Sequence, residues 1–128
     1  MSDVVLDSSA IMAVLNGEPG QNVVLPLMQG AHVSALIVAE IATILVRTGW
    51  AVEAARDRIE QLELASHDFT YDRALASGLL VAQTSVAGLS LADRACIGVG
   101  LELKLPVFTA DRAWASVAGL PLDIRLIR

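Results

Sequence analysis

The sequence is poor in the residues that build several common kinds of site. Cys96 is the only cysteine, so an internal disulfide is excluded, and with two histidines the chain has no Cys/His cluster of the kind that binds structural zinc. Two tryptophans, one tyrosine and two phenylalanines are too few for a base-stacking platform. A lone thiol is typical of a reducing compartment, so we expect a cytoplasmic protein.

Positive charge and long hydrophobic runs are also scarce. Nine Lys and Arg against fourteen Asp and Glu give a net charge of −5, which argues against broad, non-specific nucleic-acid binding. A nuclease stays possible, because bound cations can neutralise acids gathered in one site. No apolar run reaches the ~18 residues that span a bilayer, and the N-terminus lacks the basic segment of a signal peptide. A hydrophobic fraction of 55% instead predicts contact with a partner protein or with a second copy.

Short apolar runs alternate along the chain with stretches of helical periodicity. This alternation predicts an α/β fold, a three-layer α/β/α sandwich around a short, mainly parallel sheet, with one domain covering 1–128. We expect strands at 4–6, 31–33, 67–69, 106–109 and 123–126. We expect helices at 10–15, 21–29 (kinked or delayed by Pro26), 35–48, 51–66, 71–87, 90–103 and 111–117.

Acidic residues follow two of the expected strands. Asp7 ends the first strand, and Asp111 lies two residues beyond strand 106–109. In open parallel sheets, sites lie beyond the carboxyl ends of the strands where strand order reverses. If these two strands are neighbours, both acids therefore face the same crevice. Each also has an ordinary explanation, since an Asp after a strand is often a helix cap or a turn residue.

Glu40 is the only charged residue between Val33 and Val46, in a helix expected to be buried on most faces. A buried carboxylate must be paired, protonated or bound to metal. A capping box is excluded, because Glu40 lies six residues after Ser34 rather than three. Two explanations remain open: an ion pair with an arginine elsewhere, or membership of an acidic site.

Asp93 has a structural explanation of its own. Ser90 and Asp93 fit the S-x-x-D pattern of a capping box, which needs no further function. An acid in the first turn of a helix can nevertheless serve as a ligand for a site in front of that helix.

Taken together, the four carboxylates indicate more than any one of them. Carboxylates converging within a few ångströms repel by roughly 3 kcal/mol per pair at an effective dielectric near 20. Such a cluster survives at neutral pH only with a divalent cation or with raised pKa values. Ligands that are all oxygen select Mg²⁺ or Mn²⁺, and these cations are typical of phosphodiester hydrolysis.

The acids and their neighbours, in the runs 4–10, 34–40, 89–93 and 107–111, resemble those of a PIN domain, and more narrowly the VapC toxins of bacterial type II toxin–antitoxin systems. The resemblance covers essentially the whole chain. It implies Asp7 and Asp93 as principal Mg²⁺ ligands, with Glu40 and Asp111 completing the site. Ser8 and Thr109 would be supporting hydrogen-bonding residues.

The same resemblance implies an Mg²⁺-dependent endoribonuclease, with Mn²⁺ as a substitute, acting on RNA as the toxin of such a pair. A VapB-type antitoxin would cover the active-site groove with its C-terminal tail, and the toxin would form a homodimer. Arg94 and Arg112, each directly after a site acid, are candidate contacts to RNA phosphate. Their alternative is a solvated charge on a helix face.

Two other functions are weighed against this hypothesis. An aspartyl-phosphate phosphatase also places an Asp after its first strand, but it needs a second Asp two residues later, and position 9 is Ser9. A non-catalytic interaction module could keep the fold as a scaffold, although the complete set of acids argues against it.

Overall fold

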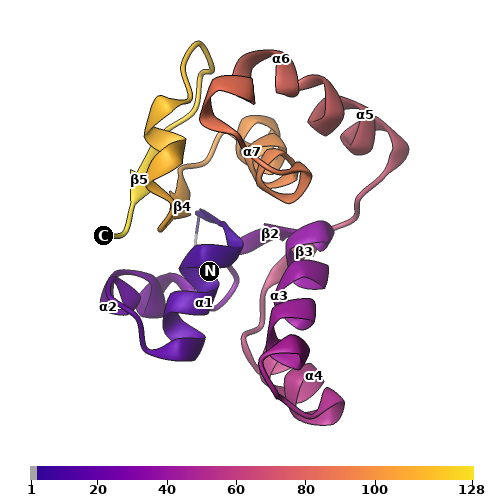
Figure 1. The fold of residues 1–128 in the computed structure, drawn as a ribbon, viewed down its shortest axis with the longest axis vertical. Coiled ribbons are helices and arrows are strands. Elements are labelled where there is room, and N and C mark those ends of the chain that lie inside the picture. Colours follow the sequence, from indigo (N-terminus) through magenta and orange to yellow (C-terminus); the bar gives the residue numbers. More distant parts are fainter. Residues whose placement is uncertain (1–2) are drawn as a thin grey trace.

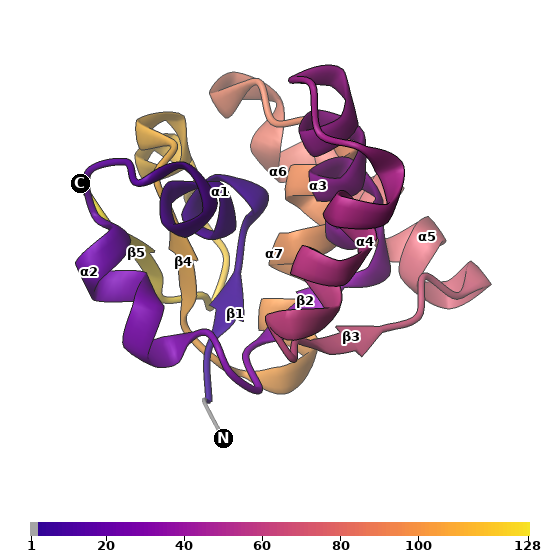
Figure 2. The same ribbon diagram turned by 90° about the horizontal axis from the view of Figure 1, so that it is seen from below.

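The computed structural model describes residues 3–128. Met1 and Ser2, at the start of the N-terminal segment that lacks the basic stretch of a signal peptide, lie outside the described residues. Five strands form one sheet in the order β3-β2-β1-β4-β5, and every pairing is parallel. Figure 2 shows them side by side in this order. The strands are β1 (Val5–Leu6), β2 (His32–Ser34), β3 (Ala65–His67), β4 (Val107–Thr109) and β5 (Ile124–Leu126).

Helices cover both faces of the sheet, which confirms the predicted three-layer α/β/α architecture (Figure 1). Parallel crossovers are right-handed, so connections that travel in opposite directions across the sheet place their helices on opposite faces. One layer holds α1 (Ser8–Asn16), α2 (Gln21–Val24), the 3₁₀ helix η1 (Leu25–Leu27), α3 (Ala35–Arg47) and α4 (Val52–Gln61). The other holds α5 (Tyr71–Leu79), α6 (Val81–Thr84), the 3₁₀ helix η2 (Ser85–Ala87) and α7 (Leu91–Leu103). A further 3₁₀ helix, η3 (Arg112–Ser116), connects β4 to β5.

Several predicted boundaries are wrong, and each has a local or tertiary cause. The first helix begins at Ser8 rather than at residue 10, because Asp7 takes the N-cap position. The expected helix 21–29 changes to 3₁₀ geometry at Leu25, before Pro26, which cannot donate a helical hydrogen bond. The segment 71–87 is interrupted at Leu80, and 111–117 forms a 3₁₀ helix rather than an α-helix.

The third strand also differs from its prediction. The helix predicted at 51–66 ends at Gln61, and the strand predicted at 67–69 occupies Ala65–His67. Pairing with β2 fixes this register, since His32 lies opposite Ala65. Tertiary pairing therefore overrides the helical periodicity at the end of α4.

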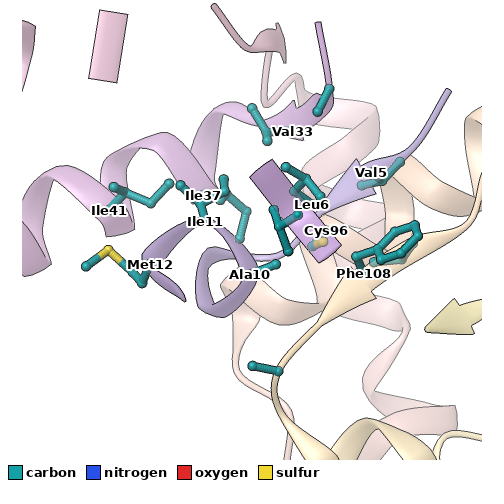
Figure 3. Close-up of a cluster of buried hydrophobic side chains, with 14 of the residues drawn as sticks. Val5, Leu6, Ala10, Ile11, Met12, Val33, Ile37, Ile41, Cys96 and Phe108 are labelled. Carbon is teal, nitrogen blue, oxygen red and sulfur yellow. The ribbon is translucent and has the colours of Figure 1, made fainter. Parts of the chain in front are cut away.

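The apolar core lies between the sheet and the helices that cover it. Leu6 of β1, Ile11 of α1, and Ile37 and Ile41 of α3 are fully buried. Figure 3 shows them gathered with Cys96 of α7, which is also fully buried. The carboxyl end of β1 is thus held from both sides by packed helices, and this rigidity is what a site at the strand end requires.

Gly100 allows α7 to approach β4 closely. A Cβ at this position would lie 2.4 Å from Val107 Cγ2 and 2.9 Å from Leu122 Cδ1. We expect Gly100→Ala to lower the free energy of unfolding by about 1–3 kcal/mol through overpacking, despite the higher helix propensity of alanine. Denaturant melts would measure this, with Gly78→Ala of α5 as the control, since a Cβ there meets nothing within 4 Å. Equal effects of the two substitutions would contradict the prediction.

Candidate active site

The sheet brings the ends of its first and fourth strands together. β1 pairs directly with β4, with Leu6 opposite Phe108. The chain runs from β1 to β2 on one side, while β4 lies on the other, so strand order reverses at this pair. Asp7 and Asp111 follow these two strands, as the sequence predicted, and lie at the edge where open α/β sheets place their sites.

Asp7 is buried, with 2% of its surface exposed. It occupies the N-cap position of α1, but its side chain makes no capping hydrogen bond. Its Oδ2 atom instead accepts hydrogen bonds from Ser9 Oγ at 2.7 Å and from Thr109 Oγ1 at 2.8 Å. Its Oδ1 atom is buried without a hydrogen-bond partner among residues 3–128. Helix capping therefore does not explain this carboxylate.

The electrostatic state of Asp7 reflects its burial. Desolvation raises the pKa of its carboxyl group from 3.8 to about 6; the hydrogen bonds from Ser9 and Thr109 act in the opposite direction, and the Asp93 carboxylate raises the pKa further. At neutral pH the group is mostly ionised in a place that disfavours its charge. A bound cation would relieve this cost.

Glu40 is held by a serine rather than by an arginine. Its Oε1 atom accepts a hydrogen bond from Ser8 Oγ at 2.6 Å, and none of the ion pairs formed within residues 3–128 includes it. The expectation that its helix is buried on most faces is wrong, because α3 buries one stripe and leaves Glu40 partly exposed. The sequence left two explanations open for Glu40, an ion pair with an arginine and membership of an acidic site. Within residues 3–128, the structure does not contain the ion pair.

Glu40→Gln separates an acidic-site role from a structural one. The amide oxygen of Gln can still accept from Ser8, and loss of the charge removes repulsion with neighbouring carboxylates. We expect the metal-free stability to be unchanged or up to about 1 kcal/mol higher, while the RNA cleavage that the family resemblance implies should fall more than about tenfold. Denaturant melts and cleavage assays would test this, with the exposed Glu60→Gln of α4 as the control. Lower stability with full activity would contradict the prediction.

Asp93 and Asp111 both cap helices. Ser90 Oγ accepts from the Asp93 amide at 3.2 Å, and Asp93 Oδ2 accepts from the Ser90 amide at 2.9 Å, which confirms the predicted capping box. Asp111 Oδ1 accepts from the Ala113 amide at 2.9 Å at the start of η3. Each cap uses one carboxylate oxygen, and the second oxygen of each makes no recorded hydrogen bond within residues 3–128.

Three of the four acids act on one buried atom. Burial raises the pKa of the Cys96 thiol, and the carboxylates of Asp7, Asp93 and Glu40 raise it further. The charges of these three acids therefore reach the same buried thiol. Asp111 is linked to Asp7 through its backbone, because its amide donates to Thr109 Oγ1 at 3.0 Å.

The four acids do not form a ready-made metal site. Among the residues that the structure describes, no group of three or more His, Cys, Asp or Glu side chains is arranged so that it could hold a metal ion. Mg²⁺ commonly keeps several waters and takes one or two carboxylates plus substrate phosphate, so an open arrangement suits it. The unpaired, buried Oδ1 atom of Asp7 and a donor set made only of oxygen fit a hard divalent cation.

The remaining predicted residues have different surroundings. The Arg94 guanidinium donates to the Ser77 carbonyl at 3.3 Å and to the Gly78 carbonyl at 3.0 Å, so it ties α7 to α5. Arg112 is exposed at the start of η3. The sequence predicts no role at the site for Ser9, although a serine two residues after an Asp can bond back to it.

Comparison with known proteins agrees with this geometry. The family model for the PIN domain matches residues 4–120. Among curated proteins, no sequence matches the chain significantly. Solved structures with a similar fold include DNA-bound VapBC from Salmonella typhimurium (18% identity, TM-score 0.74, all of both chains covered). Another is VapBC2 from Rickettsia felis bound to a promoter DNA fragment (14% identity, TM-score 0.72, covering 96% of this chain and 97% of that one).

A third structure of this kind is VapBC-1 from nontypeable Haemophilus influenzae, at 16% identity and a TM-score of 0.70, with 97% of each chain covered. These likenesses extend over the full length of the sheet and its two helical layers. The family model, in turn, spans all four acids. This chain belongs to the PIN domain family.

Proposed function

We propose that this protein is an Mg²⁺- or Mn²⁺-dependent endoribonuclease that acts as the VapC-type toxin of a toxin–antitoxin pair. The observation that carries the proposal is the buried Asp7 carboxylate, whose Oδ1 atom has no partner within residues 3–128. The charge of Asp93 acts on this carboxylate, and Glu40 is hydrogen-bonded to Ser8, the residue that follows Asp7. A structural carboxylate at this depth would have both oxygens hydrogen-bonded. PIN-domain membership supports a nuclease rather than another use of the same acids.

The roles of the four acids in this proposal are those that the family resemblance implies. Asp7 and Asp93 would hold the metal ion, with Glu40 and Asp111 completing the acidic site. The bound ion would supply a water of lowered pKa and neutralise charge on the phosphate. Ser8 keeps Glu40 in place through its hydrogen bond, and Thr109 does the same for Asp7. Arg112, which is exposed beside Asp111, is the better placed of the two candidate phosphate contacts, since Arg94 is engaged with backbone carbonyls.

A groove beside the site supports a VapB-type partner. It has a volume of about 390 Å³ and lies between α3 and the start of α7. An apolar segment carrying a cation would suit it, because its walls are mostly apolar and Glu40 adds a negative charge. The lining residues are Leu36, Ala39, Glu40, Thr43, Ser90, Leu91 and Ala92. α1 offers such a partner little surface, since most of it is buried.

Exposed apolar side chains elsewhere are compatible with a homodimer. Tyr71, Leu75 and Leu79 recur every four residues on α5 and are 80%, 51% and 64% exposed. No single helix within residues 3–128 is long and apolar enough to cross a membrane, although the bent pair Tyr71–Ala87 and Leu91–Leu103 passes by length and composition alone. We propose a cytoplasmic location on the basis of the lone reduced cysteine.

RNA cleavage with and without metal tests the proposal. The purified chain should cleave RNA with Mg²⁺ or Mn²⁺ and lose activity in EDTA. Expression of the chain alone should arrest growth, and co-expression with a VapB-type partner should restore it. A wild-type chain that is harmless and cleaves no RNA with either metal would leave the alternative, a non-catalytic interaction module of PIN fold. The aspartyl-phosphatase alternative is weaker, because Ser9 bonds to Asp7 at the position where that chemistry needs a second Asp.

A further inference from the structure

Ser9 takes part in a small hydrogen-bond network around Asp7. Its hydroxyl lies 2.7 Å from Asp7 Oδ2, 2.9 Å from the Ala110 amide nitrogen and 3.1 Å from Thr109 Oγ1. The Thr109 hydroxyl lies 2.8 Å from the same Oδ2 atom and 3.0 Å from the Asp111 amide nitrogen. Two hydroxyls thus converge on one carboxylate oxygen, and each of them accepts a hydrogen bond from a backbone amide of the turn after β4.

The chemistry of each group favours one arrangement of donors and acceptors. An amide N–H can only donate, so Ser9 accepts from Ala110 and Thr109 accepts from Asp111. Each hydroxyl has a single proton, and either hydroxyl could donate across the 3.1 Å contact between Ser9 and Thr109. The contacts to Asp7 Oδ2 are shorter, and a charge-assisted hydrogen bond is stronger, so both protons are directed to Oδ2. Oδ1 is left as the buried oxygen without a partner within residues 3–128.

We propose that Ser9 is a positioning residue: together with Thr109 it fixes Asp7 Oδ2, so that Oδ1 is the oxygen presented to a divalent cation. Ser9 also anchors the turn after β4, because the amide it accepts from belongs to Ala110, directly before Asp111. One hydroxyl in the first turn of α1 thereby sets the position of two acids, Asp7 and Asp111, which are 104 residues apart in the sequence. This inference rests on the proposed metal-dependent function.

The test measures Mn²⁺ affinity directly, from the electron paramagnetic resonance signal of free Mn²⁺, without any activity assay. Loss of a hydrogen-bond partner behind a metal ligand typically weakens metal binding 10- to 100-fold, and we expect Ser9→Ala to weaken Mn²⁺ binding within this range. Ser9→Thr, which restores a hydroxyl, should return the dissociation constant to within about threefold of wild type.

A matched control separates positioning from stability. Thr84 is buried, and its hydroxyl donates to the Leu80 carbonyl at 3.0 Å in the layer of α5–α7. Thr84→Val should lower the melting temperature without changing Mn²⁺ affinity, because it removes a buried hydroxyl away from the acids. If Ser9→Ala does not fold, Thr109→Val removes the other hydroxyl of the network, and the same weakening is expected.

The possible outcomes are distinct. A folded Ser9→Ala protein that binds Mn²⁺ as tightly as wild type overturns the positioning role and leaves the proposed function intact. If Thr109→Val is measured in place of Ser9→Ala, a folded variant that binds Mn²⁺ as tightly as wild type likewise overturns the positioning role and leaves the proposed function intact. A wild-type protein that binds no Mn²⁺ overturns the proposed function, and the positioning role with it.

Discussion

Asp7→Asn should abolish RNA cleavage and, at pH 7.5, make the metal-free protein more stable than wild type. The pKa of Asp7 rises from 3.8 to about 6 on folding, mainly through burial. The folded state therefore binds the proton more tightly than the unfolded state does. The contribution of Asp7 to stability consequently falls as the pH rises from about 4 to about 6, and the full loss, about 3 kcal/mol, is present above pH 6.

Asparagine removes this loss because it has no charge to bury. Its carbonyl oxygen can still accept from Ser9 and Thr109, but its amide group would take the place of the unpaired Oδ1 atom, at a cost of about 1–2 kcal/mol. A net gain of about 1–2 kcal/mol is therefore expected at pH 7.5, and a net loss of about 1 kcal/mol at pH 4, where the folded wild-type carboxyl is protonated and mainly the cost of the amide remains. Denaturant melts at the two pH values, together with a cleavage assay in Mn²⁺, would measure both effects.

Asp123→Asn is a suitable control for this experiment. Asp123 is exposed and pairs with Arg125 at 2.8 Å on the surface, so its substitution should change stability by less than about 1 kcal/mol and leave cleavage unaffected. If Asp7→Asn kept wild-type cleavage, or if its effect on stability were the same at pH 4 and pH 7.5, the assignment of Asp7 would be wrong.

Local signals predicted the parts of the fold that local interactions determine. Ser34 caps α3 by accepting from the Leu36 amide, and Ser90 forms its capping box with Asp93. Gly17 ends α1 in the left-handed conformation that an Asn-Gly pair predicts. Such caps depend on residues within one turn, so the sequence contains all the information they need.

The features that the sequence could not place depend on contacts between distant residues. The register of β3 is set by β2, since His32 pairs with Ala65. The exposure of Glu40 depends on which stripe of α3 packs inward, and the apolar residues on nearly every face of the helix do not distinguish the stripes.

The residues of the candidate site likewise divide into those that local sequence predicts and those that depend on contacts between distant residues. Asp7 and Asp111 could be predicted because each follows a strand, and parallel strands end at one edge of the sheet. The hydrogen-bond partners of Ser8 and Ser9, the two residues that follow Asp7, could not be predicted. Ser8 bonds to Glu40, 32 residues away, and Ser9 contacts Thr109, 100 residues away. Whether a serine caps a helix or holds a distant acid is decided by the packing of α1 against β4 and α3.

Mn²⁺ should raise the melting temperature at pH 7.5 and do so much less at pH 5. A ligand that binds only the folded state stabilises it by about 2.7 kcal/mol at a hundred times its dissociation constant. The ion needs the ionised form of Asp7, and the proton competes for that carboxylate with a pKa of about 6. Lowering the pH to 5 leaves about a tenth of the carboxylate ionised, which weakens apparent binding about tenfold and removes roughly 1.4 kcal/mol of the stabilisation.

Asp93→Asn separates the two roles of Asp93 in this experiment. The amide oxygen of Asn can still accept from the Ser90 amide, as Asp93 Oδ2 does at 2.9 Å, so the capping box and the metal-free stability should change little. Loss of the charge, however, should remove most of the stabilisation by Mn²⁺ if Asp93 is a ligand. An equal rise in melting temperature for Asp93→Asn and wild type would reduce Asp93 to a helix cap. No rise in wild type at any pH would mean that these carboxylates do not bind the metal, because relief of the buried Asp7 charge is a necessary consequence of binding beside it.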